Sequence, residues 1–267
     1  MASLLRGTAF ITGAASGIGQ HAAQSFARHG IRRLALADVN GTALAASAAA
    51  LRVEFPGLQA LELQLDVRDT AAVKAGLAEA VGALGGRLDV AVNNAGIAAS
   101  GKPTHEVPDE EWLRVNDVNF NGVWRCQREE IAIMMKQEDR GKREGRGRII
   151  NVASIFGLVG TGTTMSYTAY VASKHGVIGL TRGDANIYGQ HGIRINAICP
   201  GYVETPLLLE SLATSPDSPL GVDIARTPLK RMATMEEIGD AITMLASPMA
   251  SFMQGAALVA DGGFTTQ

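Results

Sequence analysis

The chain has 267 residues, of which 46% are hydrophobic, and is therefore long enough to bury the core of one large α/β domain. Its formal net charge of −2 argues against nucleic acid as a partner, and no apolar run reaches the ~20 residues of a membrane span. Its two cysteines, Cys126 and Cys199, lack the spacing of a disulfide framework or a zinc site, so we expect buried thiols, no metal site and a reducing, cytoplasmic location.

The first predicted elements are a strand at residues 9–11, a glycine-rich turn and a helix. The strand begins too early for a signal peptide to precede it. The turn, residues 12–19, reads TGAASGIG, and Ile18, Ala22 and Phe26 continue from it at helical spacing. Glycines allow a sharp turn and a close approach of a ligand to the backbone, and the N-terminus of the following helix favours a pyrophosphate. A turn that only packs a strand against a helix would show the same pattern.

The second predicted strand, residues 34–38, ends in Asp38. This carboxylate lies 19 residues beyond Gly19, close to the spacing at which an acidic residue of a dinucleotide fold binds the adenosine ribose. It would bind both ribose hydroxyls and repel a 2′-phosphate, and no Lys or Arg stands in the glycine turn or directly after Asp38. The pattern favours NAD as the cofactor, with NADP less favoured. The alternative is a turn residue, because Asp-Val-Asn-Gly is also good turn chemistry.

Strands and helices then alternate along the chain. Helices are predicted at 43–55 and 70–84, and strands at 58–65 and 88–92, which end at Asp66 and at Asn93-Asn94-Ala95-Gly96. This alternation is typical of βαβ units with a parallel sheet covered on both faces. Right-handed crossovers bring the carboxyl ends of the strands to one edge, so we expect both segments to lie beside the glycine turn. The alternative for Asn93 to Gly96 is a turn that only caps its strand.

A long helix is predicted at 109–136, and a charged loop follows it at 137–147. The helix contains Asn116, Asn119 and Asn121, whose low helix propensity requires compensation. Solvent exposure would compensate Asn116 and Asn121, whereas Asn119 has Val118 and Phe120 as neighbours and needs another explanation. The loop carries both signs of charge, so we interpret it as a solvated surface insertion.

The next predicted strand, residues 148–154, ends in Ser154, and a helix from about residue 166 carries Tyr170 and Lys174. Residues four apart share one face of a helix, so the phenol and the ammonium group can point into the same space. The other tyrosines have no lysine four residues later. By itself, a Tyr/Lys pair is also compatible with chance.

A sixth strand at 192–199 ends at Pro200-Gly201, and a seventh is predicted at 256–260 after a helix at 235–246. Residues 202–231 lack periodicity and contain four prolines, as expected of a substrate-binding loop. We therefore predict a single α/β domain over residues 1–267. Its fold would be a doubly wound, seven-stranded parallel sheet of the Rossmann type with helices on both faces.

Taken together, these residues resemble the short-chain dehydrogenase/reductase family, in its subgroup of ~250-residue single-domain enzymes. The resemblance covers essentially the whole chain and rests on Thr12-Gly13-x-x-x-Gly17-x-Gly19, Asp66, Asn93 to Gly96, Asn119, Ser154, Tyr170-x-x-x-Lys174, and Pro200-Gly201 with Thr205. It implies that the catalytic residues are Asn119, Ser154, Tyr170 and Lys174. It implies cofactor contacts from Tyr170 and Lys174 and from Gly13, Ser16, Gly17, Ile18, Gly19, Asp38, Asp66, Val67, Asn94, Ala95, Gly96, Pro200, Gly201, Val203 and Thr205. It also implies a homo-oligomer, a tetramer or a dimer.

One spacing departs from the family pattern. Relatives place the serine about 13 residues before the tyrosine, whereas 16 residues separate Ser154 from Tyr170. Tyr167 competes on spacing, but it has no lysine four residues later, so we choose Tyr170. We assign the surplus to the loop at 160–164, which leaves the shape of the pocket wall open.

The resemblance implies the interconversion of a secondary alcohol and a ketone by hydride transfer with NAD. Tyr170 would act as base or acid, with its pKa lowered by Lys174 and the nicotinamide ring. Ser154 would hold the substrate oxygen, and Lys174 would also bind the nicotinamide ribose. Asn119 would stabilise a bent helix and hold a water that passes protons onward from Lys174.

The predicted pocket lining, residues 97–100, 155–165 and 202–220, carries few charges and no arginine cluster. This favours a neutral, fairly apolar substrate such as a steroid-, terpenoid- or polyketide-like alcohol. A sugar-alcohol dehydrogenase, an NADP-dependent ketoreductase, and double-bond reduction or epimerisation on the same scaffold remain alternatives. A non-catalytic dinucleotide-binding sensor or scaffold is the alternative from another class. Its mark would be a damaged Ser/Tyr/Lys set, and all three residues are present.

Overall fold

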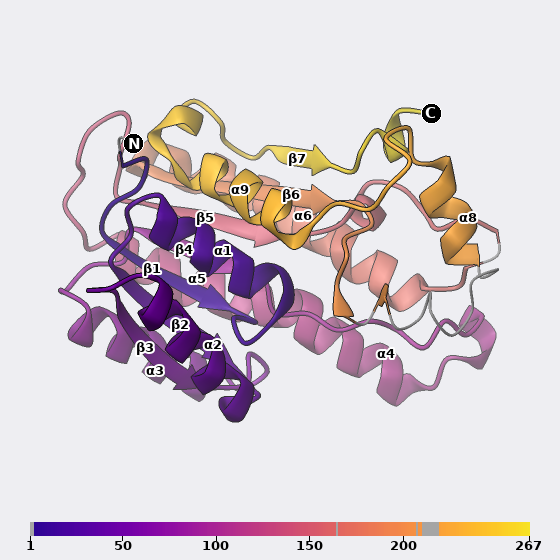
Figure 1. Cartoon of the computed structure of the whole chain (residues 1–267), viewed down its shortest axis with the longest axis horizontal. Coiled ribbons are helices and arrows are strands. Elements are labelled where there is room, and N and C mark those ends of the chain that lie inside the picture. The colour runs from indigo at the N-terminus through magenta and orange to yellow at the C-terminus, as the bar shows by residue number, and fades with distance from the viewer. Residues whose placement is uncertain (1–2, 164, 207, 210–218) are drawn as a thin grey trace.

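The computed structural model describes residues 3–163, 165–206, 208–209 and 219–267, which form a seven-stranded parallel sheet between two layers of helices (Figure 1). The strands are β1 Thr8–Thr12, β2 Arg33–Asp38, β3 Gln59–Gln64, β4 Val90–Asn93, β5 Gly147–Val152, β6 Ile193–Pro200 and β7 Ala257–Ala260. Their order in the sheet is β3-β2-β1-β4-β5-β6-β7, and all neighbouring pairs are parallel. The chain therefore winds outward in opposite directions from the β1/β4 pair, which opens a crevice at the carboxyl ends of these two strands. The predicted doubly wound, Rossmann-type sheet is confirmed.

The helices cover the sheet on both faces. One face carries α1 Gly17–Arg28, α2 Gly41–Glu54 and α9 Met235–Ala246, and the other carries α3 Thr70–Ala83, α5 Val123–Met134 and α6 Thr168–Tyr188. Side chains alternate along β1 accordingly: Ala9 and Ile11 pack with the α1 and α9 layer, and Phe10 packs with the α3 and α5 layer. The central strands are buried on both faces, which explains their continuous apolar runs.

Two short helices lie at the carboxyl end of the sheet. Figure 1 shows α4 Asp109–Asn116 and α8 Pro219–Arg226 at the side of the molecule to which the arrowheads of β5, β6 and β7 point. The interpretation of 202–231 as a loop without regular structure is wrong at α8. Four prolines hide this helix from a periodicity test, yet Pro219 is its first residue, a position that proline favours. Residues 207 and 210–218 of the predicted loop, and residue 164 of the predicted pocket lining, lie outside the described part of the chain.

The predicted helix at 109–136 is interrupted in its middle. A π-helical turn, η2 Asp117–Gly122, separates α4 from α5. Asn116 and Asn121 are half-buried and not solvent-exposed, because the Asn116 amide donates to the carbonyl of Trp112 (2.9 Å) and the Asn121 amide to Asp117 (3.2 Å). Local hydrogen bonds therefore compensate these two asparagines.

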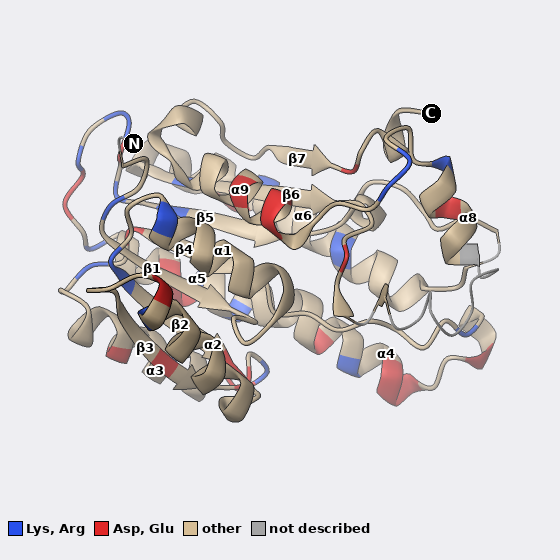
Figure 2. Ribbon diagram, in the orientation of Figure 1, with Lys and Arg blue, Asp and Glu red and all other residues tan. Residues whose placement is uncertain are grey.

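The charged loop at 137–147 is tied to the amino end of the sheet and is more than a solvated insertion (Figure 2). Asp89, 3% exposed at the start of β4, accepts hydrogen bonds from Arg87 (2.6 Å) and Arg140 (3.0 Å). The side chain of Gln137 donates to the carbonyl of Leu88 (2.9 Å). Arg148 of β5 is buried and pairs with Glu144 of the loop. These contacts anchor the loop in a region where sequence alone indicates only charge.

Among the described residues, no helix is long and apolar enough to cross a membrane. Both cysteines are buried and free, as expected. On the two long helices α5 and α6, Val123, Val177 and Ile178 are buried in the core, whereas Trp124 is 43% exposed. The predicted oligomer therefore stays a prediction.

A buried polar network joins α5 and α6 to the sheet. Asn93 at the end of β4 donates to Glu130 of α5 (3.0 Å) and to Asn151 of β5 (3.0 Å), and Asn151 donates to Thr181 of α6 (2.9 Å). Glu130 is fully buried, and its Oε1 has no hydrogen-bond partner among the described residues. Burial raises the pKa of Glu130 to about 8, with the hydrogen bond from Asn93 acting in the opposite direction. The glutamic acid is therefore neutral at physiological pH.

Replacing Glu130 with Gln should flatten the pH dependence of stability. The folded state keeps the Glu130 proton where the unfolded chain releases it, so stability is full below about pH 4.5 and falls as the pH rises toward 8, by up to about 1.4 kcal/mol per unit. Urea unfolding at pH 5 and pH 8 should show a smaller loss for Glu130→Gln than for the wild type. The neighbouring Glu129→Gln serves as the control, and equal losses in all three proteins would contradict a protonated Glu130.

Candidate functional site

The glycine turn between β1 and α1 has a steric reason for each of its glycines. Gly13 and Gly17 adopt left-handed backbone conformations (φ +65° and +59°), which side chains disfavour. A Cβ on Gly19 would lie 2.2 Å from the carbonyl oxygen of Gly13, so the first turn of α1 packs directly on the end of β1. A Cβ on Gly17 would meet nothing within 4 Å. The turn is therefore tight at Gly13 and Gly19 and open to a ligand at Gly17.

The end of β4 is bonded to this turn. The Asn94 amide donates to the carbonyls of Thr12 and Gly13 (both 3.1 Å), and the Thr12 hydroxyl accepts from the backbone N–H groups of Asn94 (3.0 Å) and Ala95 (3.1 Å). We call these four bonds the Thr12–Asn94 cluster. Asn94 is thus more than the strand cap that its sequence would allow. Thr12 was not among the predicted site residues, although its place in the glycine motif was a usable signal.

The start of α1 fits a phosphate group. Ser16 precedes the helix in an extended conformation, and its side chain makes no capping hydrogen bond. The N–H groups of the first helical turn have no partner within the helix and, with the helix dipole, favour an anion. Ile18, which directly follows Gly17, packs against the hydrophobic core. An open glycine beside uncapped N–H groups is what the pyrophosphate of a dinucleotide requires.

Asp38 lies at the end of β2 and touches the glycine turn. Its carboxylate accepts hydrogen bonds from the backbone N–H groups of Ala15 (3.1 Å) and Asn40 (2.9 Å). Both interpretations of Asp38 therefore have support, because it stabilises its own turn and also presents a half-buried carboxylate at the crevice.

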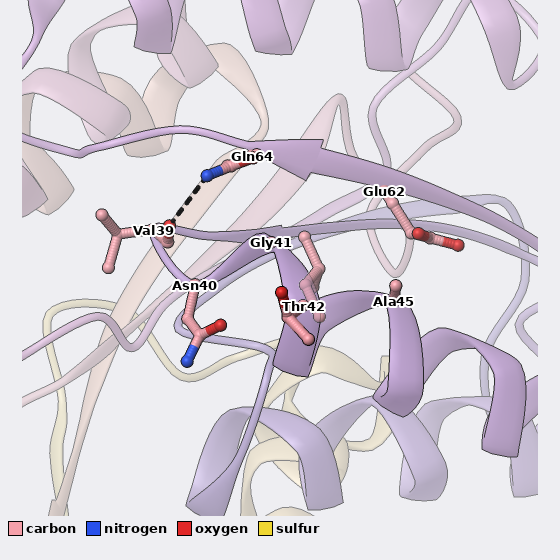
Figure 3. Close-up of a pocket in the computed structure, with 8 residues that line it drawn as sticks. Val39, Asn40, Gly41, Thr42, Ala45, Glu62 and Gln64 are labelled. Atoms are coloured by element: carbon pink, nitrogen blue, oxygen red, sulfur yellow. Dashed lines mark hydrogen bonds between the residues drawn. The ribbon is translucent and has the colours of Figure 1, made fainter.

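A concavity of about 740 Å³ opens beside the end of β2 (Figure 3). It is lined by residues of the β2–α2 connection, of the first turns of α2 and of the edge strand: Val39, Asn40, Gly41, Thr42, Leu44, Ala45, Glu62 and Gln64. None of these lining residues is Lys or Arg, and Glu62, the one acid among them, is paired with Arg52 (2.8 Å). The lining beside Asp38 thus supplies no cation of its own for a 2′-phosphate.

Asp66 and Val67 follow β3 on the same edge. The Asp66 carboxylate is engaged by Arg68 (Nη2 to Oδ2, 2.6 Å), whose hydrogen bonds hold the pKa of Asp66 below its ordinary value. Val67 is buried, and a Cβ on Gly122 of the π-helical turn would lie 2.7 Å from it. Any ligand of Asp66 shares the carboxylate with Arg68, a partner that the sequence analysis did not include.

The predicted catalytic residues come from three elements and converge near Gly96. Ser154 (7% exposed) follows β5, Tyr170 and Lys174 lie on α6, and Asn119 lies in the π-helical turn. A Cβ on Gly96 would lie 3.3 Å from Asn119 Oδ1 and 3.7 Å from Lys174 Nζ, so Gly96 packs closely against both side chains. Lys174 Nζ lies 5.5 Å from the centre of the Tyr170 ring and donates to the carbonyl of Val152 (2.8 Å).

Asn119 is held on both of its polar atoms. Its Oδ1 accepts from the N–H of Ile97 (2.8 Å), and its Nδ2 donates to the carbonyl of Ile97 (2.9 Å) and, at 3.4 Å, to the hydroxyl of Ser173. The side chain is fully buried. These hydrogen bonds compensate the low helix propensity of Asn119. The sequence does not reveal them, because they join the π-helical turn to the loop after β4 and to α6.

The protonation of the Tyr170/Lys174 pair is dominated by burial. Burial raises the pKa of Tyr170, and a hydrogen bond with Ser154 acts in the opposite direction. Burial lowers the pKa of Lys174 to about 8. In the chain without cofactor, desolvation outweighs the hydrogen bond with Ser154, so the lowering of the Tyr170 pKa by Lys174 and a bound nicotinamide ring stays a prediction.

The remaining predicted contacts follow β6. Gly201 donates its N–H to the carbonyl of Ala260 at the end of β7 (3.0 Å), and a Cβ on Gly201 would lie 2.8 Å from the Cα of Asp261. Pro200 is the last residue of β6, Val203 is buried, and the N–H of Thr205 bonds to the carbonyl of Val203 (2.6 Å). The structure thus brings these residues to the same carboxyl edge as the glycine turn.

Comparisons with known proteins agree with this arrangement. The family model described as enoyl-(acyl carrier protein) reductase matches residues 13–265. The cis-4-hydroxycyclohexanecarboxylate dehydrogenase of Sinomonas cyclohexanicum is 40% identical over 257 residues, 96% of each chain. The 2,5-dichloro-2,5-cyclohexadiene-1,4-diol dehydrogenase of Sphingobium indicum is 37% identical over 268 residues, 99% of each chain. Among solved structures, levodione reductase matches with a TM-score of 0.88 and 34% identity, covering 97% of this chain and 98% of that one.

The fold and these similarities define the class of protein. The chain is an oxidoreductase whose family uses a nicotinamide dinucleotide, NAD or NADP. It belongs to the short-chain dehydrogenase/reductase family, as its sequence motifs predict.

Two alanine substitutions in the glycine turn should affect different properties, one mainly the stability of the fold and the other mainly dinucleotide binding. Gly19→Ala places a Cβ against backbone and should lower the melting temperature strongly. Gly17→Ala meets no protein atom, so it should cost only about 1–2 kcal/mol for its left-handed backbone but weaken dinucleotide binding. Thermal unfolding and NADH fluorescence titration separate the two effects. Unchanged NADH affinity in Gly17→Ala would remove the open glycine from the cofactor site.

Proposed function

We propose that this protein is an NAD-dependent dehydrogenase that interconverts a secondary alcohol and a ketone on a six-membered carbon ring. The observation that carries the proposal is the convergence of Ser154, Tyr170 and Lys174 beside the crevice at the carboxyl ends of β1 and β4. Two of the relatives are named for alcohols on such rings, and a third relative is named as a reductase. The uncharged stretches 97–100 and 155–163 support the broader expectation of a fairly apolar substrate.

Tyr170 is the proton-transfer residue in this proposal. In oxidation its phenolate takes the hydroxyl proton of the alcohol, and in reduction its phenol returns that proton to the ketone oxygen. The nicotinamide, when bound, accepts the hydride from the carbinol carbon or supplies it. Because burial raises the pKa of Tyr170, the protonated form that serves reduction predominates at neutral pH, and oxidation gains from alkaline pH.

The other three residues position the reacting groups. Ser154 donates to the substrate oxygen and holds it within reach of Tyr170. Lys174, buried beside the Tyr170 ring, supplies a positive charge that favours the phenolate and can bind the nicotinamide ribose. Asn119 holds the π-helical turn against Ile97 and so keeps the floor of the site in place.

NAD is the favoured cofactor because of the charges around Asp38. A 2′-phosphate would approach the carboxylate of Asp38, and the lining of the neighbouring concavity includes no Lys or Arg. Gly17 and the uncapped start of α1 would hold the pyrophosphate. A cytoplasmic location and a homo-oligomer remain part of the proposal on the strength of the family resemblance.

Two other functions can be tested in the same assay. The name of the matching family model favours double-bond reduction as a second candidate, so an enoyl thioester belongs in the substrate panel. A non-catalytic dinucleotide sensor would oxidise or reduce no compound in the panel. Absorbance at 340 nm with ring alcohols, ring ketones and an enoyl thioester separates these functions.

Replacing Tyr170 with Phe should remove turnover and leave cofactor binding largely intact. Loss of a general acid–base residue is expected to lower kcat about 10²–10⁴-fold. The matched control is Tyr167→Phe, which removes a hydroxyl at the competing spacing and should retain activity. NADH titration of both variants tests cofactor binding, and an active Tyr170→Phe variant would refute the assignment.

Removing the charge of Asp38 should relax the choice of cofactor. Asp38→Asn keeps one acceptor oxygen and can retain one of the two hydrogen bonds from the N–H groups of Ala15 and Asn40, while Asp38→Ala loses both. Both variants should bind NAD about tenfold or more weakly and discriminate less against NADP. Dissociation constants for NADH and NADPH provide the measurement. A wild type that prefers NADPH would contradict the ribose argument.

A further inference from the structure

The helix α8, which periodicity did not reveal, carries a buried carboxylate at the carboxyl edge. Asp223 is 6% exposed, and its Oδ2 accepts a hydrogen bond from the hydroxyl of Tyr202 (2.9 Å). Tyr202 directly follows Pro200-Gly201. Burial of the phenol and the nearby Asp223 carboxylate both raise the pKa of Tyr202, so Tyr202 remains a donor. Asp223 is therefore the hydrogen-bond acceptor of this pair.

Asp223 is connected to the catalytic serine through two aromatic rings. The ring of Tyr202 packs edge-on against Phe156, with ring centres 6.4 Å apart and planes at 77°. The backbone N–H of Phe156 donates to the hydroxyl of Ser154 (3.2 Å). Tyr202 and Phe156 thus join the carboxylate of α8 to the segment that begins at Ser154.

The lengthened Ser154–Tyr170 connection also reaches Asp223. A Cβ on Gly162 would lie 3.9 Å from Asp223 Oδ2, so this stretch of the loop borders the carboxylate. In the same stretch, the hydroxyl of Thr161 donates to the carbonyl of Met165 (2.6 Å). The departure from the family spacing therefore places Gly162 next to Asp223.

Few other charges act at this place. Residues 97–100, 155–163 and 165–170 contain no charged side chain. Arg226, on the same helix, approaches Asp223 Oδ1 at 3.6 Å, but its side chain is 62% exposed and its charge is screened by solvent. Glu204, the other acidic residue near Tyr202 in the sequence, is half-buried. Its charge contributes, after that of Glu237, to the raised pKa of Arg231.

We propose that Asp223 determines which ring alcohols this protein accepts. A carboxylate accepts hydrogen bonds and repels a second carboxylate in a poorly solvated site. Asp223 therefore selects substrates whose second ring substituent is a hydroxyl or ammonium donor and rejects those that carry a carboxylate. The inference rests on the proposed ring-alcohol function, and it groups this chain by chemistry with the relative named for a diol and apart from the relative named for a carboxylate.

A series of three substrates that differ in charge tests the inference. Cyclohexane-1,4-diol, 4-aminocyclohexanol and 4-hydroxycyclohexanecarboxylate are compared by kcat/KM with NAD. The wild type should prefer the diol and the amine over the carboxylate by at least about tenfold, the ratio that 1.4 kcal/mol supports. Asp223→Asn should lower that preference about tenfold, mainly through KM for the carboxylate. Arg226→Gln should preserve or increase it, because it removes the cation that partly neutralises Asp223.

The control is Asp109→Asn, which removes an exposed acid at the start of α4 and should leave the preference unchanged. A general loss of folding would not change the substrate preference in opposite directions in Asp223→Asn and Arg226→Gln. An equal preference in the wild type and in Asp223→Asn would overturn the inference.

A binding measurement separates this inference from the proposed function. The thermal stabilisation of the NADH complex by cyclohexanol and by cyclohexanecarboxylate is compared in the wild type and in Asp223→Asn. Failure to oxidise any of the three alcohols refutes the ring-alcohol function. In that case a carboxylate ligand that stabilises only Asp223→Asn still supports the charge selection, and equal stabilisation of both proteins refutes it.

Discussion

The Thr12–Asn94 cluster is the interaction on which the site depends. Four hydrogen bonds of 3.0–3.1 Å join the end of β1 to the end of β4, the two strands from which the sheet winds outward in opposite directions. The cluster fills the space that a Cβ on Gly13 or Gly19 would need. It therefore determines both the shape of the glycine turn and the direction in which the chain leaves β4. The crevice at the switch point follows from this one junction.

Two of the proposed catalytic residues contact the chain that leaves that junction. Asn119 is hydrogen-bonded to both the N–H and the carbonyl of Ile97, and both Asn119 and Lys174 pack closely against Gly96. Asn119 reaches Ile97 from the π-helical turn and not from the face of a regular α-helix. Asn93, at the end of β4, donates hydrogen bonds to the neutral Glu130 of α5 and to Asn151 of β5, and so joins both elements to the same strand end. Polar groups that would destabilise a core in isolation are stabilised here by one another.

Sequence patterns predicted the parts of this structure that depend on burial and topology. Apolar runs marked the strands, and parallel winding placed Gly13, Asp38, Asp66 and Asn94 at one edge. Three features were missed for physical reasons. Prolines mask α8, a helix of only eight residues. The asparagines of the π-helical turn are satisfied by distant or local partners that propensity does not record. Arg68 and Asp223 act through side-chain contacts that no motif encodes.

The direction of the Tyr170 pKa shift has a consequence for the order of events. In the chain alone, burial favours the neutral phenol of Tyr170, whereas oxidation requires the phenolate, and burial also lowers the pKa of Lys174 to about 8. A positively charged ring beside Tyr170 would favour the phenolate, and by linkage the phenolate would favour that ring. Binding of the oxidised cofactor and activation of the base are then a single coupled equilibrium. The low dielectric that opposes the phenolate also strengthens this coupling. Tyr170 would therefore act as a base chiefly when the oxidised cofactor is bound.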